Sequence, residues 1–175
     1  AEMFSSAKRP FFNSTQTLPL ERIDRDVYFE FAREKMSAVC SLPREVFDRV
    51  YGMFDGITWY VQSILNRIWQ TGEGFTSPSQ IDEAVSDLVE DRSMVFRDLY
   101  FSQNASSQSL LAAIAADGMA SSVLSGDFLR RHSLTATSSV RAALKVLLEA
   151  DLVYRTDQGY VIYDRIFGEW LRRKA

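Results

Sequence analysis

Apolar side chains recur at intervals of three and four residues through the first hundred positions, which is the spacing of a buried helix face. Glycines and prolines divide this pattern into segments, and Asp24 is placed to cap the N-terminus of one segment. The turn-rich stretch 72–79 precedes the last and longest segment. The predicted elements are the end of a helix at 1–7, a short strand at 15–20, and helices at about 24–39, 43–56, 58–72 and 78–102.

The pattern changes after the polar stretch 102–107, where we place a boundary between two domains. Helix, short helix, turn, longer helix and hairpin then follow, which is the order of elements in a winged helix-turn-helix. The hairpin turn is expected at residues 157–159, with two short strands beside it. The expected helices are 107–118, 127–132, 137–153 and 164–173. The predicted fold class is therefore mainly α, with a helical bundle at 1–104 and a winged helix with a small β-hairpin wing at 105–175.

The predicted helix at 137–153 has one apolar and one polar face. Its apolar positions recur at helical spacing and are expected to pack on the two preceding helices. They are Val140, Leu144, Leu147 and Leu148. The opposite face is the one that a recognition helix presents to the major groove of DNA. It carries Ser138, Arg141, Lys145 and Glu149. Thr137 or Ser138 is expected to cap this helix and to donate to a phosphate.

Basic residues outside this helix extend the candidate nucleic-acid surface. Arg130 and Arg131 precede the predicted turn, and Arg155 lies in the wing. Two carboxylates are expected to repel an anionic ligand. Glu149 lies on the recognition face, and Asp157 lies at the wing tip. A DNA-binding protein commonly contacts about six to ten phosphates, which is more than these basic residues supply. Winged helices also bind RNA and dock proteins, so the partner is either a nucleic acid or a protein.

Composition excludes other classes of protein. The chain has 175 residues, of which 46% are hydrophobic and 25% charged, as in ordinary globular domains. No apolar run is long enough to span a bilayer, so we expect no membrane partner. The net charge of -3 is unevenly distributed. Residues 1–100 hold 11 basic and 16 acidic side chains, whereas residues 101–175 hold 9 and 7, which favours an anionic partner for the C-terminal part.

Residues suited to catalysis or metal binding are scarce. Cys40 and His132 are the single cysteine and histidine, so we expect no zinc site, no cofactor bound by the chain itself and no enzyme activity. A lone thiol suits a reducing compartment, which predicts a cytoplasmic protein. The acidic cluster at 82–91 is interpreted as a solvated helix face, in which Arg92 and Arg97 pair with some of the carboxylates.

Aromatic residues make up 13% of the chain. Most of them, including Trp59, Trp69 and Trp170, are expected to be buried in the core. An exposed aromatic cluster would instead mark a docking surface, and the chain would then act as an interaction scaffold.

Four segments cover most of the chain: MFSSAKRPFFNSTQTLPLERID, DRDVYFEFAREKM, VFDRVYGMFDGITWYVQSILNRIW and SSVRAALKVLLEADLVYRTDQGYVIYDRIFGEWLRR. Together they resemble the C-terminal part of a family of prokaryotic P-loop ATPases of the AAA+/STAND type, in which a nucleotide-binding domain is followed by a helical lid and then by a winged helix. The first segment resembles the stretch that leaves the ATPase core, and the second resembles the first lid helix. The third is similar to the lid motif, although Asp55-Gly56-Ile57-Thr58 replaces the Gly-Gly-x-Pro turn of many relatives. The fourth resembles the terminal winged helix.

The resemblance implies a lid-like domain at 1–104, with a remnant of the ATPase core at 1–20, and an upstream P-loop ATPase domain as partner. The intact parent would bind ATP and Mg²⁺, and Arg9 and Arg67 are candidate nucleotide contacts, with a solvated arginine as the alternative for each. The phosphate-binding pattern G-x-x-x-x-G-K-[ST] is missing from the sequence. The chain is therefore expected to be a non-catalytic fragment that couples nucleotide state to a nucleic-acid or protein partner. The alternative is a free-standing winged-helix transcription regulator that binds DNA.

Overall fold

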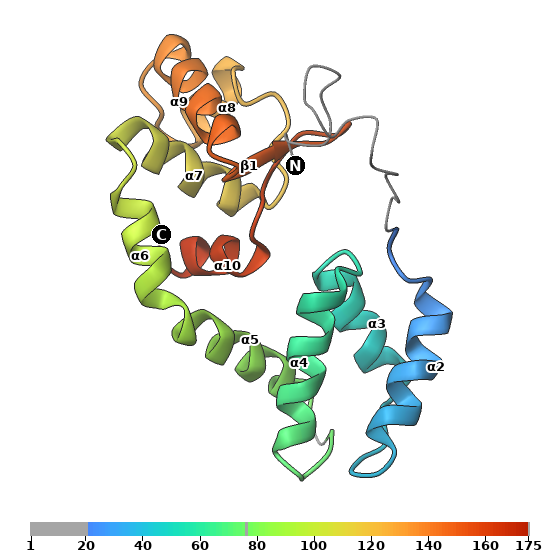
Figure 1. Cartoon of the computed structure of the whole chain (residues 1–175). Helices are drawn as coiled ribbons and strands as arrows, with labels where there is room; N and C mark the ends of the chain where they lie inside the picture. Colours follow the sequence, from blue (N-terminus) through green and yellow to red (C-terminus); the bar gives the residue numbers. More distant parts are fainter. Residues whose placement is uncertain (1–20, 76, 175) are drawn as a thin grey trace, which may run out of the picture.

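The computed structural model describes residues 21–75 and 77–174 (Figure 1). The predicted helix end at 1–7, the predicted strand at 15–20 and the candidate nucleotide contact Arg9 lie outside the described residues. Within the described ranges, no helix combines the length and the apolar composition needed to cross a membrane. The chain is mainly helical and ends in a small antiparallel hairpin and a last helix, which confirms the predicted fold class.

Three helices form the N-terminal bundle, close to the predicted ranges. They are α2 (Arg25–Met36), α3 (Arg44–Met53) and α4 (Thr58–Gln70). Each buries one apolar face, and Phe47, Val50, Val61 and Ile64 are wholly inaccessible to solvent. Aromatic rings of α2 and α3 pack against each other. The ring centroid of Phe47 lies 5.5 Å from that of Tyr28, in an edge-on contact.

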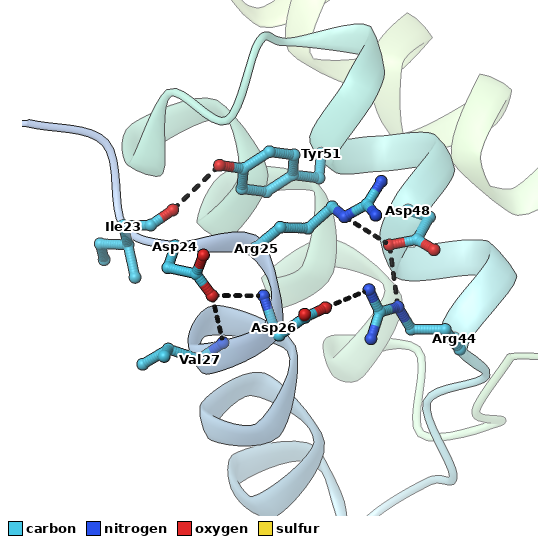
Figure 2. A network of polar contacts seen from close by, with 8 residues as sticks. All are labelled: Ile23, Asp24, Arg25, Asp26, Val27, Arg44, Asp48 and Tyr51. Carbon is cyan, nitrogen blue, oxygen red and sulfur yellow. Dashed lines mark hydrogen bonds and ion pairs between the residues drawn. The ribbon is translucent and has the colours of Figure 1, made fainter.

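Polar contacts hold α2 against the start of α3 (Figure 2). Asp24 Oδ1 accepts hydrogen bonds from the backbone N–H groups of Asp26, at 2.9 Å, and of the next residue, which confirms the predicted helix cap. Arg44 reaches back from α3 and forms ion pairs with both Asp26 and Asp48. The hydrogen bonds that Arg44 donates to these two carboxylates raise its pKa further above the usual value of an arginine.

The long helix predicted at 78–102 is wrong, because two helices occupy this range. They are α5 (Ser79–Asp91) and α6 (Ser93–Phe101), and Arg92 between them leaves the helical conformation with φ -107° and ψ 3°. The Arg92 guanidinium lies 5.0 Å from the Phe96 ring and 5.6 Å from the Trp59 ring, and it pairs with Asp164. The break therefore coincides with tertiary contacts of one side chain, which helical periodicity cannot reveal.

The C-terminal elements follow the predicted winged-helix order. They are α7 (Ala105–Asp117), α8 (Gly126–Arg131), α9 (Thr137–Glu149), β1 (Val153–Arg155), β2 (Tyr160–Ile162) and α10 (Arg165–Lys174). The strands are antiparallel, with Val153 opposite Ile162. Ala120 adds an isolated bridge to Tyr160 through two hydrogen bonds of 2.9 Å. Gly159 is required beside this bridge, because a Cβ there would lie 2.6 Å from the carbonyl oxygen of Ala120.

One hydrophobic core runs through the described residues without a break at residue 104. The apolar stripe of α9 packs on α7, and Val140, Leu144 and Leu147 are buried as predicted, while Leu148 is partly buried. Helix α10 lies between α7 and the α5–α6 pair (Figure 1). Phe167 on α10 is buried 5.3 Å from the Phe96 ring of α6. The domain boundary at 104/105 remains a prediction.

A polar cluster, which we call the Asp164 junction, joins the N-terminal bundle to α10. It comprises Asp55, Tyr60, Arg92, Asp164 and Arg165. Asp164 Oδ1 accepts hydrogen bonds from the Tyr60 hydroxyl at 3.2 Å and from two backbone N–H groups at the start of α10, at 2.9 and 3.1 Å. Asp164 Oδ2 accepts from Arg92 at 3.0 Å. One carboxylate therefore caps α10 and ties it to α4 and to the α5–α6 break.

Arg165 extends this junction to the wing. Its backbone N–H donates to the Tyr60 hydroxyl at 3.0 Å, and its guanidinium pairs with Asp55 in the turn between α3 and α4. The same guanidinium donates to the hydroxyl of Tyr154 in β1 at 3.2 Å. Burial, and then the charge of Asp164, raises the pKa of Tyr60 to about 12. The Tyr60 hydroxyl therefore stays protonated at neutral pH, as its donation to Asp164 requires.

Candidate nucleic-acid interface

Helix α9 presents the predicted recognition face to solvent. Ser138, Arg141, Lys145 and Glu149 are all exposed. Arg141 forms no ion pair in the described part of the chain, whereas Lys145 Nζ lies 3.8 Å from a Glu149 carboxylate oxygen. The free positive charge of this face is therefore centred on Arg141.

The start of α9 differs from the prediction that Thr137 or Ser138 caps the helix. Ala136 is the capping residue, and no side chain accepts a hydrogen bond from the first turn. The backbone N–H groups of residues 137–139 thus have no helical partner and no side-chain cap. Such groups, with the positive end of the helix dipole, favour an anion at this end.

The sequence pattern did not single out two apolar residues that lie on the exposed face of α9. Ala142 and Val146 are exposed between the polar positions, with Val146 retaining 41% of its surface. The signal for them was present in the helical spacing, because the angle between successive residues places both beside Arg141 and Lys145. Small apolar groups at such positions suit contact with the methyl group of thymine.

Arg130 and Arg131 lie at the end of α8, and both are engaged by carboxylates of the same chain. Arg130 pairs with Asp127 one turn earlier, and Arg131 pairs with Asp117 at the end of α7. His132 Nε2 lies 3.0 Å from the second oxygen of Asp117. These contacts reduce the positive charge that either arginine offers to a ligand.

The wing places Arg155 at the solvent-exposed end of β1, opposite Tyr160. Arg155 has no carboxylate partner among residues 21–75 and 77–174. The wing turn is held by Thr156, whose hydroxyl oxygen accepts from the backbone N–H of Gly159 at 3.1 Å. Asp157 is exposed in that turn. The wing thus carries one unpaired cation and one anion close together in sequence.

The candidate nucleotide contact Arg67 lies on α4 facing the acidic helix α5. Its guanidinium pairs with Asp91, and its Nη1 lies 3.9 Å from Asp87. Asp82, at the other end of α5, pairs with Arg49 at 2.9 Å. Asp82, Asp87 and Asp91 of α5 therefore find their partners on α3 and α4, and not through Arg92 and Arg97 as expected from local spacing.

Two of the three tryptophans are exposed, so the prediction that they lie in the core is wrong. Trp59 retains 51% and Trp69 39% of its surface. With Phe31 of α2, they line a groove of about 540 Å³ between α2 and α4. Among the described residues that line it, Lys35 is the one with a charge. Trp170 is partly buried against α6. The groove is an exposed aromatic cluster of the kind that was expected to mark a docking surface.

Comparison with known families gives a match for the C-terminal part of the chain. Residues 94–173 match the family described as a probable winged helix domain. The match begins inside α6 and includes α7 to α10 almost completely. No curated protein and no solved structure matches the chain. A winged helix domain is typically DNA-binding, which agrees with the coarser part of the predicted function.

Proposed function

We propose that the winged helix binds duplex DNA through the exposed face of α9 and through the wing. The observation that carries this proposal is the pair of exposed arginines, Arg141 on α9 and Arg155 on β1, neither of which has an ion-pair partner in the described chain. An arginine that forms no ion pair within the protein keeps its charge and its planar set of donors for a ligand. Phosphate and the guanine edge both match that geometry.

The spacing on α9 suits the repeat of DNA. Arg141 and Lys145 are one helical turn apart, about 6 Å along the helix axis. Two base steps of a duplex span about 7 Å. The uncapped N–H groups at the start of α9 and the hydroxyl of Ser138 then provide a second phosphate contact at the helix end.

The acidic residues set the strength of this binding. Glu149 forms an ion pair with Lys145, and Asp157 lies two positions after Arg155 in the wing. We therefore expect few phosphate contacts, about two to four, and a correspondingly shallow dependence of affinity on salt. Replacement of Glu149 by glutamine should strengthen binding, because it frees Lys145 and removes one negative charge.

The double variant Arg141→Ala/Lys145→Ala should bind duplex DNA at least about tenfold more weakly at low salt. Each lost phosphate contact also removes about 0.9 from the slope of log affinity against log salt, so the slope should fall by roughly two. Fluorescence anisotropy over a salt series measures both quantities.

A matched control removes the same charge elsewhere. Arg97 and Arg173 are exposed and have no ion pairs in the described chain, so Arg97→Ala/Arg173→Ala should leave DNA binding nearly unchanged. Equal weakening in both double variants would show that net charge alone attracts DNA, and α9 would lose its assigned role.

A second function is proposed for the N-terminal bundle, as the lid of a P-loop ATPase whose nucleotide-binding domain lies upstream. The groove with Trp59 and Trp69 supports it, since two large apolar side chains gain from being covered by another domain. In this proposal Arg67 is held in place by Asp87 and Asp91 for contact with nucleotide phosphates. The winged helix would then carry the nucleotide state to its partner.

The lid proposal is tested by joining the chain to its P-loop domain and measuring ATP turnover and ATP affinity. Removal of the chain should change both quantities, and Trp59→Ala/Trp69→Ala should reproduce much of that change. Met94→Ala, at a site that is 77% exposed and outside the groove, should have no effect. Turnover and affinity that are unchanged without the chain would exclude a lid role.

A further inference from the structure

Three aromatic rings surround the ammonium group of Lys174 near the end of α10. Its Nζ lies 3.9 Å from the ring centroid of Tyr100, 4.0 Å from that of Phe101 and 5.0 Å from that of Trp170. All three distances are within the range in which the negative face of a ring attracts a cation. We call Tyr100, Phe101 and Trp170 the aromatic cage.

The rings of the cage form walls instead of a stack. The planes of Tyr100 and Phe101 meet at 80°, and those of Tyr100 and Trp170 meet at 63°. Trp170 is itself supported by a stacked contact with the buried Phe167, at 5.9 Å. Tyr100 and Trp170 are packed against the core, whereas Phe101 is 59% exposed. Two walls of the cage are therefore in place before any ligand arrives, which lowers the ordering that binding of a cation requires.

A hollow of about 770 Å³ lies beside the cage between α5, α6 and α10. Phe101, Trp170 and Lys174 line it, together with the exposed Arg97 and Arg173. Both arginines are without ion-pair partners in the described residues. The carboxylates of Asp87 and Glu90 also border the hollow. The site thus combines a cation-binding cage with two free guanidinium groups.

We propose that the aromatic cage binds the trimethylammonium group of a zwitterionic ligand such as phosphocholine, whose phosphate faces Arg97 and Arg173. Lys174 occupies the cage when no ligand is present. A lysine ammonium is compact and strongly hydrated, whereas a quaternary ammonium has no N–H donors and holds water less strongly. The aromatic cage should therefore prefer the quaternary cation. This site is separate from the α9 face and does not depend on DNA binding.

Binding is measured by the fluorescence of Trp170 in the variant Trp59→Phe/Trp69→Phe, with calorimetry as an independent readout. Choline and phosphocholine should both bind saturably, and phosphocholine should bind more tightly. The neutral carbon isostere of choline should not bind, because it has the same shape without the charge. Absence of saturable binding for both choline and phosphocholine, or equal binding of the neutral isostere, would overturn the proposal.

Variants separate the parts of the site. Lys174→Ala should raise the affinity for choline about threefold to tenfold, because it removes the internal competitor. Phe101→Leu should lower that affinity by a similar factor while keeping an apolar side chain at an exposed position. Arg97→Ala/Arg173→Ala should abolish the preference for phosphocholine over choline. Lys145→Ala removes one positive charge from α9, as Lys174→Ala does from α10, and should change none of these affinities.

Two outcomes would contradict specific parts of this assignment. Weaker choline binding in Lys174→Ala would mean that Lys174 supports the site instead of competing for it, and the cage would not be a ligand site. An undiminished preference for phosphocholine in Arg97→Ala/Arg173→Ala would remove the two arginines from the site.

Discussion

Phe167→Ala lowers the free energy of unfolding by about 3–5 kcal/mol, which is the expected cost of deleting a wholly buried ring. Phe167 is 1% exposed, and its ring lies 5.3 Å from Phe96 and 5.9 Å from Trp170. The substitution leaves a cavity between α10 and α6, and both helices also pack against α5, which opposes closure of the gap. Urea unfolding followed by circular dichroism measures the loss.

The same variant tests whether the two parts of the chain unfold together. Because α10 contacts α5, α6 and α7, we expect one transition, in which circular dichroism and the fluorescence of Trp59 and Trp69, recorded in a Trp170→Phe background, have coincident midpoints. A control is Phe31→Ala, at a ring that is 51% exposed, which should cost less than about 1 kcal/mol. Separate midpoints, with the fluorescence transition unaffected by Phe167→Ala, would show that the N-terminal bundle folds independently.

Asp164→Ala has the second-largest expected effect, a loss of about 2–4 kcal/mol. Loss of a helix cap costs about 1 kcal/mol. The partners left behind add about 1–3 kcal/mol, because the hydroxyl of Tyr60 and the guanidinium of Arg92 each lose an acceptor in a partly buried place. For a chain of this size, the loss corresponds to a fall in Tm of roughly 5–15 °C. Thermal and urea unfolding measure it.

Two further variants show which contact of Asp164 matters. Asp164→Asn keeps an oxygen for the helix cap but loses the charge that pairs with Arg92, so it should cost less than the alanine variant. Asp157→Ala, in the exposed wing turn, should change stability by no more than about 0.5 kcal/mol. A double-mutant cycle with Arg92→Ala measures the coupling. A coupling near zero would mean that the ion pair does not hold α10 to the α5–α6 break.

The candidate interface shows which features could be predicted from the sequence and which could not. The polar face of α9 was predicted because helical spacing alone decides which residues share a face, and Ser138, Arg141 and Lys145 are exposed accordingly. The reduced availability of Arg131 could not be predicted, because its partner Asp117 lies on another helix. Ion pairs between elements depend on how those elements pack, which sequence spacing does not encode.

The aromatic residues show the same limit. Trp59 and Trp69 belong to an amphipathic helix, and composition favours burial of such large apolar side chains. They are exposed because α2 and α4 leave a groove between them, with Trp59 at one end of α4 and Trp69 at the other. The aromatic cage likewise joins two neighbours on α6 to a residue of α10 that is seventy positions away from Tyr100 in the sequence.

The sequence by itself determined most of the described helices, the hairpin, the winged-helix order and the exposed face of α9. These features follow from local rules, because the periodicity of apolar residues and the preferences of capping and turn residues act over a few positions. Only the tertiary structure decided the break at Arg92, the pairing of Arg67 and Arg131, the Asp164 junction and the aromatic cage. Each of these features brings together side chains from elements that are distant in the chain. Their interactions can stabilise the protein only after those elements have packed against one another.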